Sequence, residues 1–133
     1  MDKEINLNTH TKLPKKYGYV VDINEEEGSA KVVLETIQEM AVDEEGLIHG
    51  AFTFGAADLC AMATVNEPYV VLVKSSCEFL APVKVGDRVE FVSETLMKEK
   101  RKHEIKVRGF LKDIKVFEGL FSCVVLENHV LKK

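Results

Sequence analysis

A single acidic residue, Asp58, lies in an otherwise uncharged stretch of the sequence. Residues 51–65 carry this one charge, whereas the overall charged fraction of 30% would place four or five charges in fifteen residues. The stretch is rich in alanine and apolar on nearly every side, so it predicts a buried helix. Burial disfavours the charged form of a carboxyl group, so the pKa of Asp58 should be raised. A raised pKa makes the ionised carboxylate a stronger general base.

Gly50 directly precedes this stretch. The first backbone N–H groups of a helix have no partner within the helix, and the helix dipole favours negative charge near them. A glycine at this position lets a ligand approach the backbone closely. The Gly50 N–H group is therefore a candidate donor to the negative charge that develops on a carbonyl oxygen under attack. A base and an oxyanion donor are two of the groups that acyl-group hydrolysis requires.

The spacing of these two residues sets a geometric constraint. Gly50 and Asp58 are eight residues apart, which corresponds to about 12 Å along one helix. They cannot both contact one carbonyl group from the same chain. If both act on one substrate, they come from two copies of the chain, so we expect a homodimer with two shared sites, paired again into a dimer of dimers. A second copy would also cover a helix that is apolar on all sides.

Most of the remaining chain predicts β-strands. Residues 17–24 are aromatic and β-branched, and residues 29–40 alternate between the two faces of a strand, so these segments predict a hairpin that turns near Gly28. Asn66 and Pro68 mark the end of the helix. Further strands are expected at residues 69–80, 88–98, 102–111 and 115–126. One helix covered by an antiparallel sheet is an α+β layout.

Length and composition limit the class of protein. A chain of 133 residues is long enough for one core of ordinary size, so we expect a loosely packed polar leader at residues 1–16 and a single domain at residues 17–133. The formal net charge of −4 argues against a globally basic nucleic-acid binder. No signal-peptide pattern is present, and no apolar run approaches the ~20 residues that span a bilayer, so we expect a cytoplasmic protein without a membrane partner.

The cysteines and histidines do not form a metal-binding pattern. Three cysteines and four histidines occur without CxxC, HExxH or helical i, i+4 spacing, so neither a metal nor a cofactor is expected. Each cysteine has apolar neighbours, which predicts buried positions for Cys60, Cys77 and Cys123.

Three short motifs occur in a fixed order along the chain. They are G-x-x-H-G at residues 46–50, A-D at residues 57–58, and F-L-x-P-x-x-x-G-D at residues 79–87. In this order and spacing the chain resembles the hotdog-fold acyl-CoA thioesterases, most closely the phenylacetate-pathway (PaaI-type) branch of the 4-hydroxybenzoyl-CoA thioesterase superfamily. The resemblance implies a hotdog fold, in which an antiparallel sheet wraps one long buried helix, and hydrolysis of acyl-CoA to free acid and CoA. The family usually has a second glycine where this chain has Ala51.

The resemblance also implies roles for individual residues. Asp58 would be the general base or the nucleophile, Gly50 the oxyanion donor, and Ala51 part of the substrate site. Asp43 occupies a position where related thioesterases often carry an asparagine that holds water or substrate, and His49 would orient the loop or the substrate. Structural alternatives remain open: a hydroxyl partner for Asp58, a solvated loop acid at Asp43, and a hydrogen bond at His49 that only fixes the turn.

A basic segment lies near a predicted turn. Lys100, Arg101 and Lys102 carry positive charge that could meet the phosphates of CoA. The alternative is a solvated hairpin whose charges discourage pairing at a sheet edge.

Two other functions are compatible with a hotdog domain. The first is a non-catalytic acyl-CoA sensor, although such sensors tend to lack the helix acid that this chain keeps at Asp58. The second is a hydratase or dehydratase, which generally pairs an acid with a histidine. His49 precedes the helix and no second histidine is placed for that role, so this function ranks last.

Overall fold

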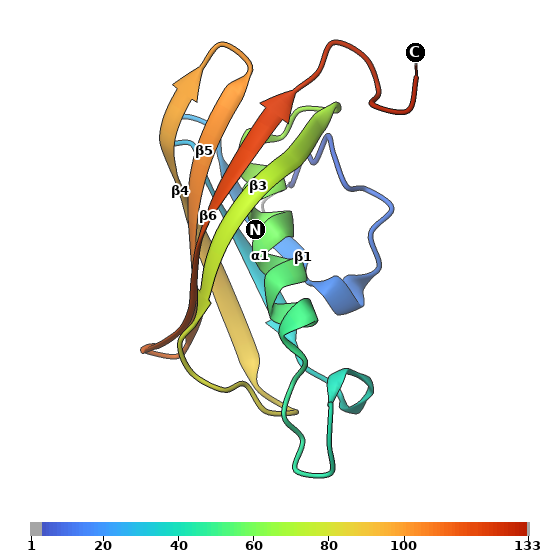
Figure 1. The fold of residues 1–133 in the computed structure, drawn as a ribbon, viewed down its shortest axis with the longest axis vertical. Helices are drawn as coiled ribbons and strands as arrows, with labels where there is room; N and C mark the ends of the chain where they lie inside the picture. Colours follow the sequence, from blue (N-terminus) through green and yellow to red (C-terminus); the bar gives the residue numbers. More distant parts are fainter. Residues whose placement is uncertain (1–3, 133) are drawn as a thin grey trace.

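A single helix packs against one large antiparallel sheet (Figure 1). The computed structural model describes residues 4–132. Within them the six-stranded sheet has the order β1-β2-β4-β5-β6-β3, which confirms the predicted α+β layout. The elements are η1 (Lys15–Tyr17), β1 (Tyr19–Asn24), β2 (Ser29–Glu35), η2 (Gln38–Met40), α1 (Gly50–Val65), β3 (Val70–Phe79), β4 (Arg88–Glu99), β5 (Lys102–Leu111) and β6 (Ile114–Val125).

The predicted hairpin forms between β1 and β2, which pair antiparallel from Tyr19 opposite Val33 to Asn24 opposite Ser29. The second strand was predicted to continue to residue 40, but it ends at Glu35. Thr36 is still bonded to the turn that precedes β4: its N–H donates to the carbonyl of Asp87 (3.0 Å), and its hydroxyl donates to the same oxygen (2.7 Å). The chain then leaves the sheet and forms η2.

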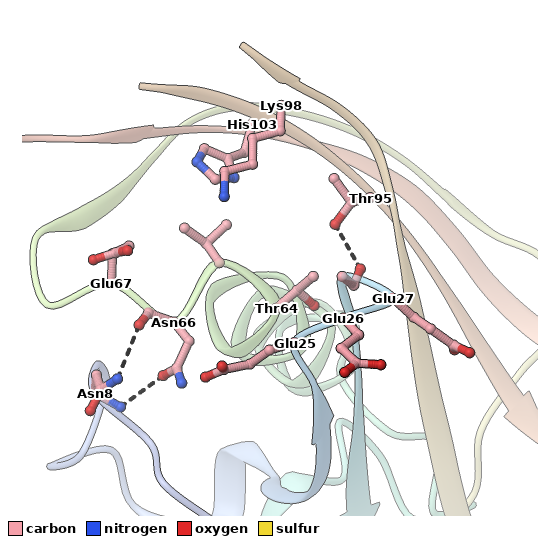
Figure 2. A pocket seen from close by; sticks show the side chains of 12 residues that line it. Asn8, Glu25, Glu26, Glu27, Thr64, Asn66, Glu67, Thr95, Lys98 and His103 are labelled. Carbon is pink, nitrogen blue, oxygen red and sulfur yellow. Dashed lines mark hydrogen bonds between the residues drawn. The ribbon is translucent and has the colours of Figure 1, made fainter. Parts of the chain in front are cut away.

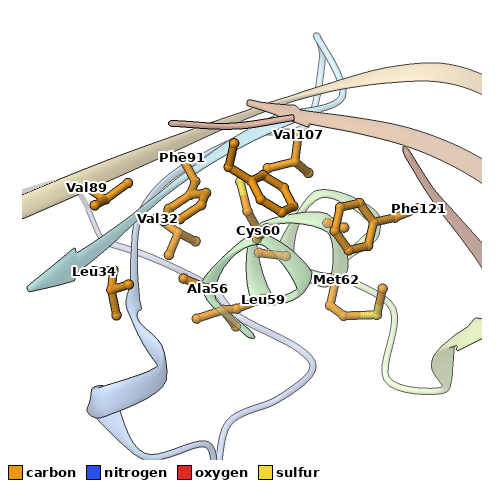
Figure 3. Close-up of a cluster of buried hydrophobic side chains, with 14 of the residues drawn as sticks. Val32, Leu34, Ala56, Leu59, Cys60, Met62, Val89, Phe91, Val107 and Phe121 are labelled. Atoms are coloured by element: carbon orange, nitrogen blue, oxygen red, sulfur yellow. The ribbon is translucent and has the colours of Figure 1, made fainter. Parts of the chain in front are cut away.

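The hydrophobic core lies between α1 and the face of the sheet that curves around it (Figure 3). Large side chains of the strands meet small side chains of the helix, which allows the helix to approach the sheet closely. Cys60 and Cys123 are buried as predicted, whereas Cys77 is only half-buried because β3 lies at the edge of the sheet. No helix among residues 4–132 is long and apolar enough to cross a membrane. Core side chains drawn in Figure 3 include Val32, Leu34, Ala56, Cys60, Met62, Phe91, Val107 and Phe121.

Part of the cover of α1 comes from Tyr17 of η1, which directly follows the leader in the same chain. The ring of Tyr17 stacks on Phe52 with centroids 5.4 Å apart. The same ring lies against Gly55, where an added Cβ would be 3.2 Å from it. This flank of the helix is therefore covered within the chain, and cover by a second copy stays a prediction for the rest of the helix.

Asn66 connects the leader to the end of α1. It ends the helix in the left-handed conformation (φ 53°), is 7% exposed, and its Oδ1 accepts from the N–H of Asn8 at 2.7 Å. Its Nδ2 donates to the carbonyl of Asn6 at 2.9 Å. Thr9 is also buried. Residues 6–9 are therefore not loosely packed, contrary to the sequence-based expectation.

Replacing Asn66 with alanine should lower the free energy of unfolding by about 2 kcal/mol, because two part-buried hydrogen bonds are lost and alanine disfavours a positive φ. Urea unfolding measures the change. Asn66→Gly is the matched control, since glycine adopts this φ without strain and should recover about 1 kcal/mol relative to alanine. Equal stability of the alanine variant and the wild type would contradict the role of Asn66.

Candidate active site

Asp58 has an unpaired oxygen atom within the fold. The side chain is half-buried, and its Oδ1 is buried without a hydrogen-bond partner in the described part of the chain. Burial raises the pKa of Asp58 to about 6, which confirms the expected direction. The alternative of a hydroxyl partner finds no support at this atom. An unpaired buried carboxylate oxygen destabilises a fold, so it is a feature that calls for a function.

Two thiols lie on the side of the sheet that Asp58 faces. Burial raises the pKa of Cys77 on β3, and the charge of Asp58 adds to this effect. A hydrogen bond from Ser75 opposes it. Burial, followed by the charge of Asp58, raises the pKa of Cys123 on β6 to about 12. The charge of Asp58 therefore acts on thiols of both β3 and β6, and both thiols are protonated at neutral pH.

The N-terminus of α1 leaves one specific N–H group open. His49 is the N-cap residue, and its Nδ1 accepts from the N–H of Ala51 at 2.8 Å. The carbonyl of His49 accepts from the N–H of Phe52 at 3.1 Å. No described residue accepts from the N–H of Gly50, the first residue of the helix. This is the N–H group that the sequence singled out as an oxyanion donor.

The cap also determines which hydrogen-bonding groups of His49 and Ala51 remain available to a substrate. Because Nδ1 of His49 is an acceptor, the neutral imidazole carries its proton on Nε2. The side chain is exposed, so Nε2–H faces solvent. The observed bond is the turn-fixing alternative for His49, and a role in orienting substrate stays a prediction. The N–H of Ala51 is occupied, so a substrate role for Ala51 would have to use its side chain.

Asp43 stabilises the loop before the helix. Its Oδ1 accepts from the N–H groups of Glu45 (3.0 Å) and Leu47 (3.2 Å). The side chain is exposed, and its contacts are those of a loop-fixing acid. The structure therefore does not bring Asp43 together with Asp58, and a catalytic role for it stays a prediction.

An apolar pocket of about 350 Å³ lies beside Gly50. The ring of Phe79 forms one wall, with its Cε1 3.3 Å from the position that a Cβ on Gly50 would take. Phe79 in turn contacts Phe117 edge-on, with centroids 5.4 Å apart. Phe79 and Pro82 belong to the F-L-x-P motif at residues 79–82, which is the sequence signal for this wall. The lining residues are Leu47, Ile48, Gly50, Thr53, Phe79, Leu80, Ala81, Pro82, Val83 and Val116.

The basic turn lies far from Gly50 within one chain. Lys100, Arg101 and Lys102 line a hollow of about 510 Å³ with Glu99 and Val124. Arg101 forms an ion pair with Glu127. The turn between β4 and β5 lies at the end of the sheet near the C-terminus of α1, whereas Gly50 is at the opposite end of the helix (Figure 1). The structure therefore separates the two predicted parts of the substrate site within a chain.

One helix held in a six-stranded antiparallel sheet is a hotdog-type fold, with an acid on the helix and an open N–H group at its start. The Thioesterase superfamily matches residues 45–118, more than half of the chain, and the chain belongs to this superfamily. An uncharacterised protein from Pyrococcus horikoshii is 44% identical, with a TM-score of 0.91 over 99% of both chains.

Other relatives differ in their names. A region of methylthioribose-1-phosphate isomerase from Aquifex aeolicus is 43% identical over 75% of this chain, which spans 22% of that protein. Transcription factor FapR from Caldanaerobacter subterraneus is 27% identical over 76% of this chain, which spans half of that protein. A hypothetical thioesterase from Streptococcus pneumoniae, solved with coenzyme A, is 16% identical over 84% of this chain and 88% of its own, with a TM-score of 0.73. This last likeness concerns the fold alone.

Proposed function

We propose that the protein hydrolyses acyl-CoA thioesters to a free acid and CoA at sites shared between two subunits, as a cytoplasmic thioesterase of the phenylacetate-pathway type. The observation that carries the proposal is the Asp58 carboxylate, which keeps a buried oxygen unpaired and has a pKa of about 6. The open N–H of Gly50 supplies the complementary group. The Thioesterase superfamily match over residues 45–118 supports a thioester substrate.

The chemistry follows from these two groups. The thioester oxygen accepts a hydrogen bond from Gly50 of one subunit, which stabilises the negative charge of the tetrahedral intermediate. Asp58 of the other subunit either removes a proton from the attacking water or attacks the carbonyl carbon itself, and water then hydrolyses the resulting anhydride. In both routes a C–O bond forms, the C–S bond breaks, and the CoA thiolate leaves and takes up a proton.

The apolar pocket beside Gly50 fits the acyl group. Its lining residues are almost entirely aliphatic and aromatic, and one of them is Gly50, whose N–H would bind the carbonyl oxygen. An apolar acyl chain or ring in this pocket would bring the thioester to Gly50. The ring of Phe79 would limit the width available next to the carbonyl carbon.

The edge strand β3 is the surface that would join two subunits. It pairs only with β6 in the sheet, and Val73 is 60% exposed on it. Pairing two such edges antiparallel would place the two helices antiparallel, so that Gly50 of one lies near Asp58 of the other. The same arrangement brings the basic turn of one subunit, Lys100 to Lys102, closer to the site of the other, where it would meet CoA phosphates.

A second candidate function is acyl-CoA binding without hydrolysis. The likeness to proteins named Transcription factor FapR favours it. The retained Asp58 favours the enzyme. An assay of free-thiol release from short, long and aromatic acyl-CoAs separates the two functions: hydrolysis of any of them supports the thioesterase, whereas tight binding without turnover supports the sensor.

Mixing two inactive variants tests the shared site. Asp58→Asn chains keep Gly50, and Gly50→Pro chains keep Asp58, so a mixed dimer rebuilds one of its two sites. Refolding the variants together in equal amounts should restore about a quarter of wild-type activity, because half of randomly assorted dimers are mixed. Activity that stays at the level of the parent variants, or a monomer in sedimentation at micromolar concentration, would contradict a shared site.

A further inference from the structure

A polar cleft of about 570 Å³ lies at the C-terminal end of α1, away from Gly50 (Figure 2). Four segments form it: the turn between β1 and β2, the end of the helix, the adjoining parts of β4 and β5, and the leader. Its volume is in the range of small-molecule sites. None of the chemistry proposed for the thioesterase uses it. Its lining residues are Asn8, Glu25, Glu26, Glu27, Gly28, Thr64, Val65, Asn66, Glu67, Thr95, Lys98 and His103.

His103 is a buried polar residue of this cleft. It is only 7% exposed, and its ring has no hydrogen bond to any described residue. Figure 2 shows the imidazole extending from β5 into the cleft, above Glu67 and Asn66. Burial, followed by the charge of Lys98, lowers the pKa of His103, and Glu67 opposes this effect. The ring is therefore neutral at physiological pH and can accept one hydrogen bond and donate another.

The charge of the cleft is negative. Four glutamates line it and Lys98 is the one lysine among its lining residues. The carbonyl end of α1 adds the negative pole of the helix dipole. The carboxylates come from two sides: Glu25 and Glu26 lie on the turn, and Glu67 follows the helix. This distribution favours a ligand that carries two separated positive charges.

The walls of the cleft are held in place before any ligand arrives. The hydroxyl of Thr95 donates to the carbonyl of Gly28 at 2.6 Å, which fixes the turn that carries Glu25 and Glu26. Asn66 is bonded to Asn8 and Asn6, which fixes the segment that leads to Glu67. A site with fixed walls loses little conformational entropy when it binds.

We propose that this cleft binds a small aliphatic diamine. One ammonium group lies between Glu67 and the carbonyl end of α1, the other meets Glu25 and Glu26, and the methylene chain crosses Val65. His103 accepts a hydrogen bond from the ammonium group nearer to it. Lys98 excludes a third positive charge on its side of the cleft.

Titration of the full-length protein with putrescine, followed by NMR of the histidine rings, tests the site. The His103 ring signals should shift along a saturable curve, while those of His49 should not. Bound cation should lower the pKa of His103 further, because it disfavours the imidazolium. Glu67→Gln should weaken binding about fivefold, as expected for loss of one nearby charge.

Glu44→Gln is the matched control, because Glu44 is an exposed loop glutamate outside the cleft. It changes the net charge equally and should leave binding within about twofold, since screening is strong beyond about 10 Å at 0.1 M salt. Absence of a His103 shift would overturn the proposal, and so would equal weakening by both variants. The same saturable shift with magnesium chloride at matched ionic strength would also overturn it, because the cleft would then be a general counter-ion site.

Discussion

Asparagine in place of Asp58 should reduce acyl-CoA hydrolysis by about 10²- to 10⁴-fold, the contribution typical of a general base. The amide has nearly the shape of the carboxyl group but cannot take a proton from water or attack a carbonyl. The wild-type rate should rise with pH through about 6, as Asp58 loses its proton. Steady-state release of free thiol across this pH range measures both effects.

Asp43→Asn is the matched control for this substitution. The asparagine Oδ1 can accept the same two bonds from Glu45 and Leu47, so the loop should keep its conformation. Activity within a few-fold of wild type is expected on the geometry of the loop. Full activity of Asp58→Asn with an intact fold would refute the mechanism, and a large loss in Asp43→Asn would assign Asp43 the catalytic role that its loop contacts do not favour.

The same Asp58 substitution should make the protein more stable at neutral pH. The pKa of Asp58 is raised in the fold from 3.8 to about 6, so the folded state favours the protonated form. This contribution is present below about pH 4 and is lost as pH rises through about 6. Asp58→Asn should therefore raise the free energy of unfolding at pH 7 by on the order of 2 kcal/mol, with little change at pH 4. Urea unfolding at the two pH values would show whether activity and stability change in opposite directions.

Proline in place of Gly50 should lower kcat by about 10²- to 10³-fold, the effect of losing one oxyanion-hole donor. Proline removes the N–H and nothing else that the helix needs, since the first helical position has no intrahelical bond to lose. His49 already has an extended backbone (φ −62°, ψ 131°), which is the conformation that a following proline requires. Circular dichroism should therefore show an intact helix.

Gly50→Ala separates the loss of the N–H from the added bulk. Alanine keeps the donor but adds a Cβ that would lie 3.3 Å from the ring of Phe79. That ring is 56% exposed and can shift, so we expect a change of less than about tenfold, mainly in KM. Equal losses in the proline and alanine variants would mean that crowding, and not the missing donor, causes the effect.

The strands could be predicted from the sequence because their residues alternate between two faces. The helix and Asp58 could be predicted because residues 51–65 carry no other charge. The sequence also singled out the Gly50 N–H as a donor, because this residue starts the predicted helix. It could not show that the N–H of Ala51 is occupied, because that depends on which N–H group the His49 ring reaches. The sequence-based prediction placed both Gly50 and Ala51 in the site. In the structure, the N–H of Ala51 donates to the His49 ring, whereas the N–H of Gly50 stays open.

Contacts between segments that are distant in the sequence could not be predicted either. Asn66 could be read as a helix end, but its bonds to Asn6 and Asn8 join residues about sixty positions apart. The polar leader therefore looked loose in the sequence although it packs on the helix. The cleft around His103 likewise combines four segments, each of which is unremarkable in the linear chain.

The packing of Tyr17 on Phe52 and Gly55 has a consequence for assembly. Because Tyr17 occupies one flank of α1 and the sheet another, less of the helix surface remains for a second chain. Residues outside any interface would thus limit which interface forms. Variation at this position among relatives could then change how copies of the same fold associate, without any change in the strands that meet.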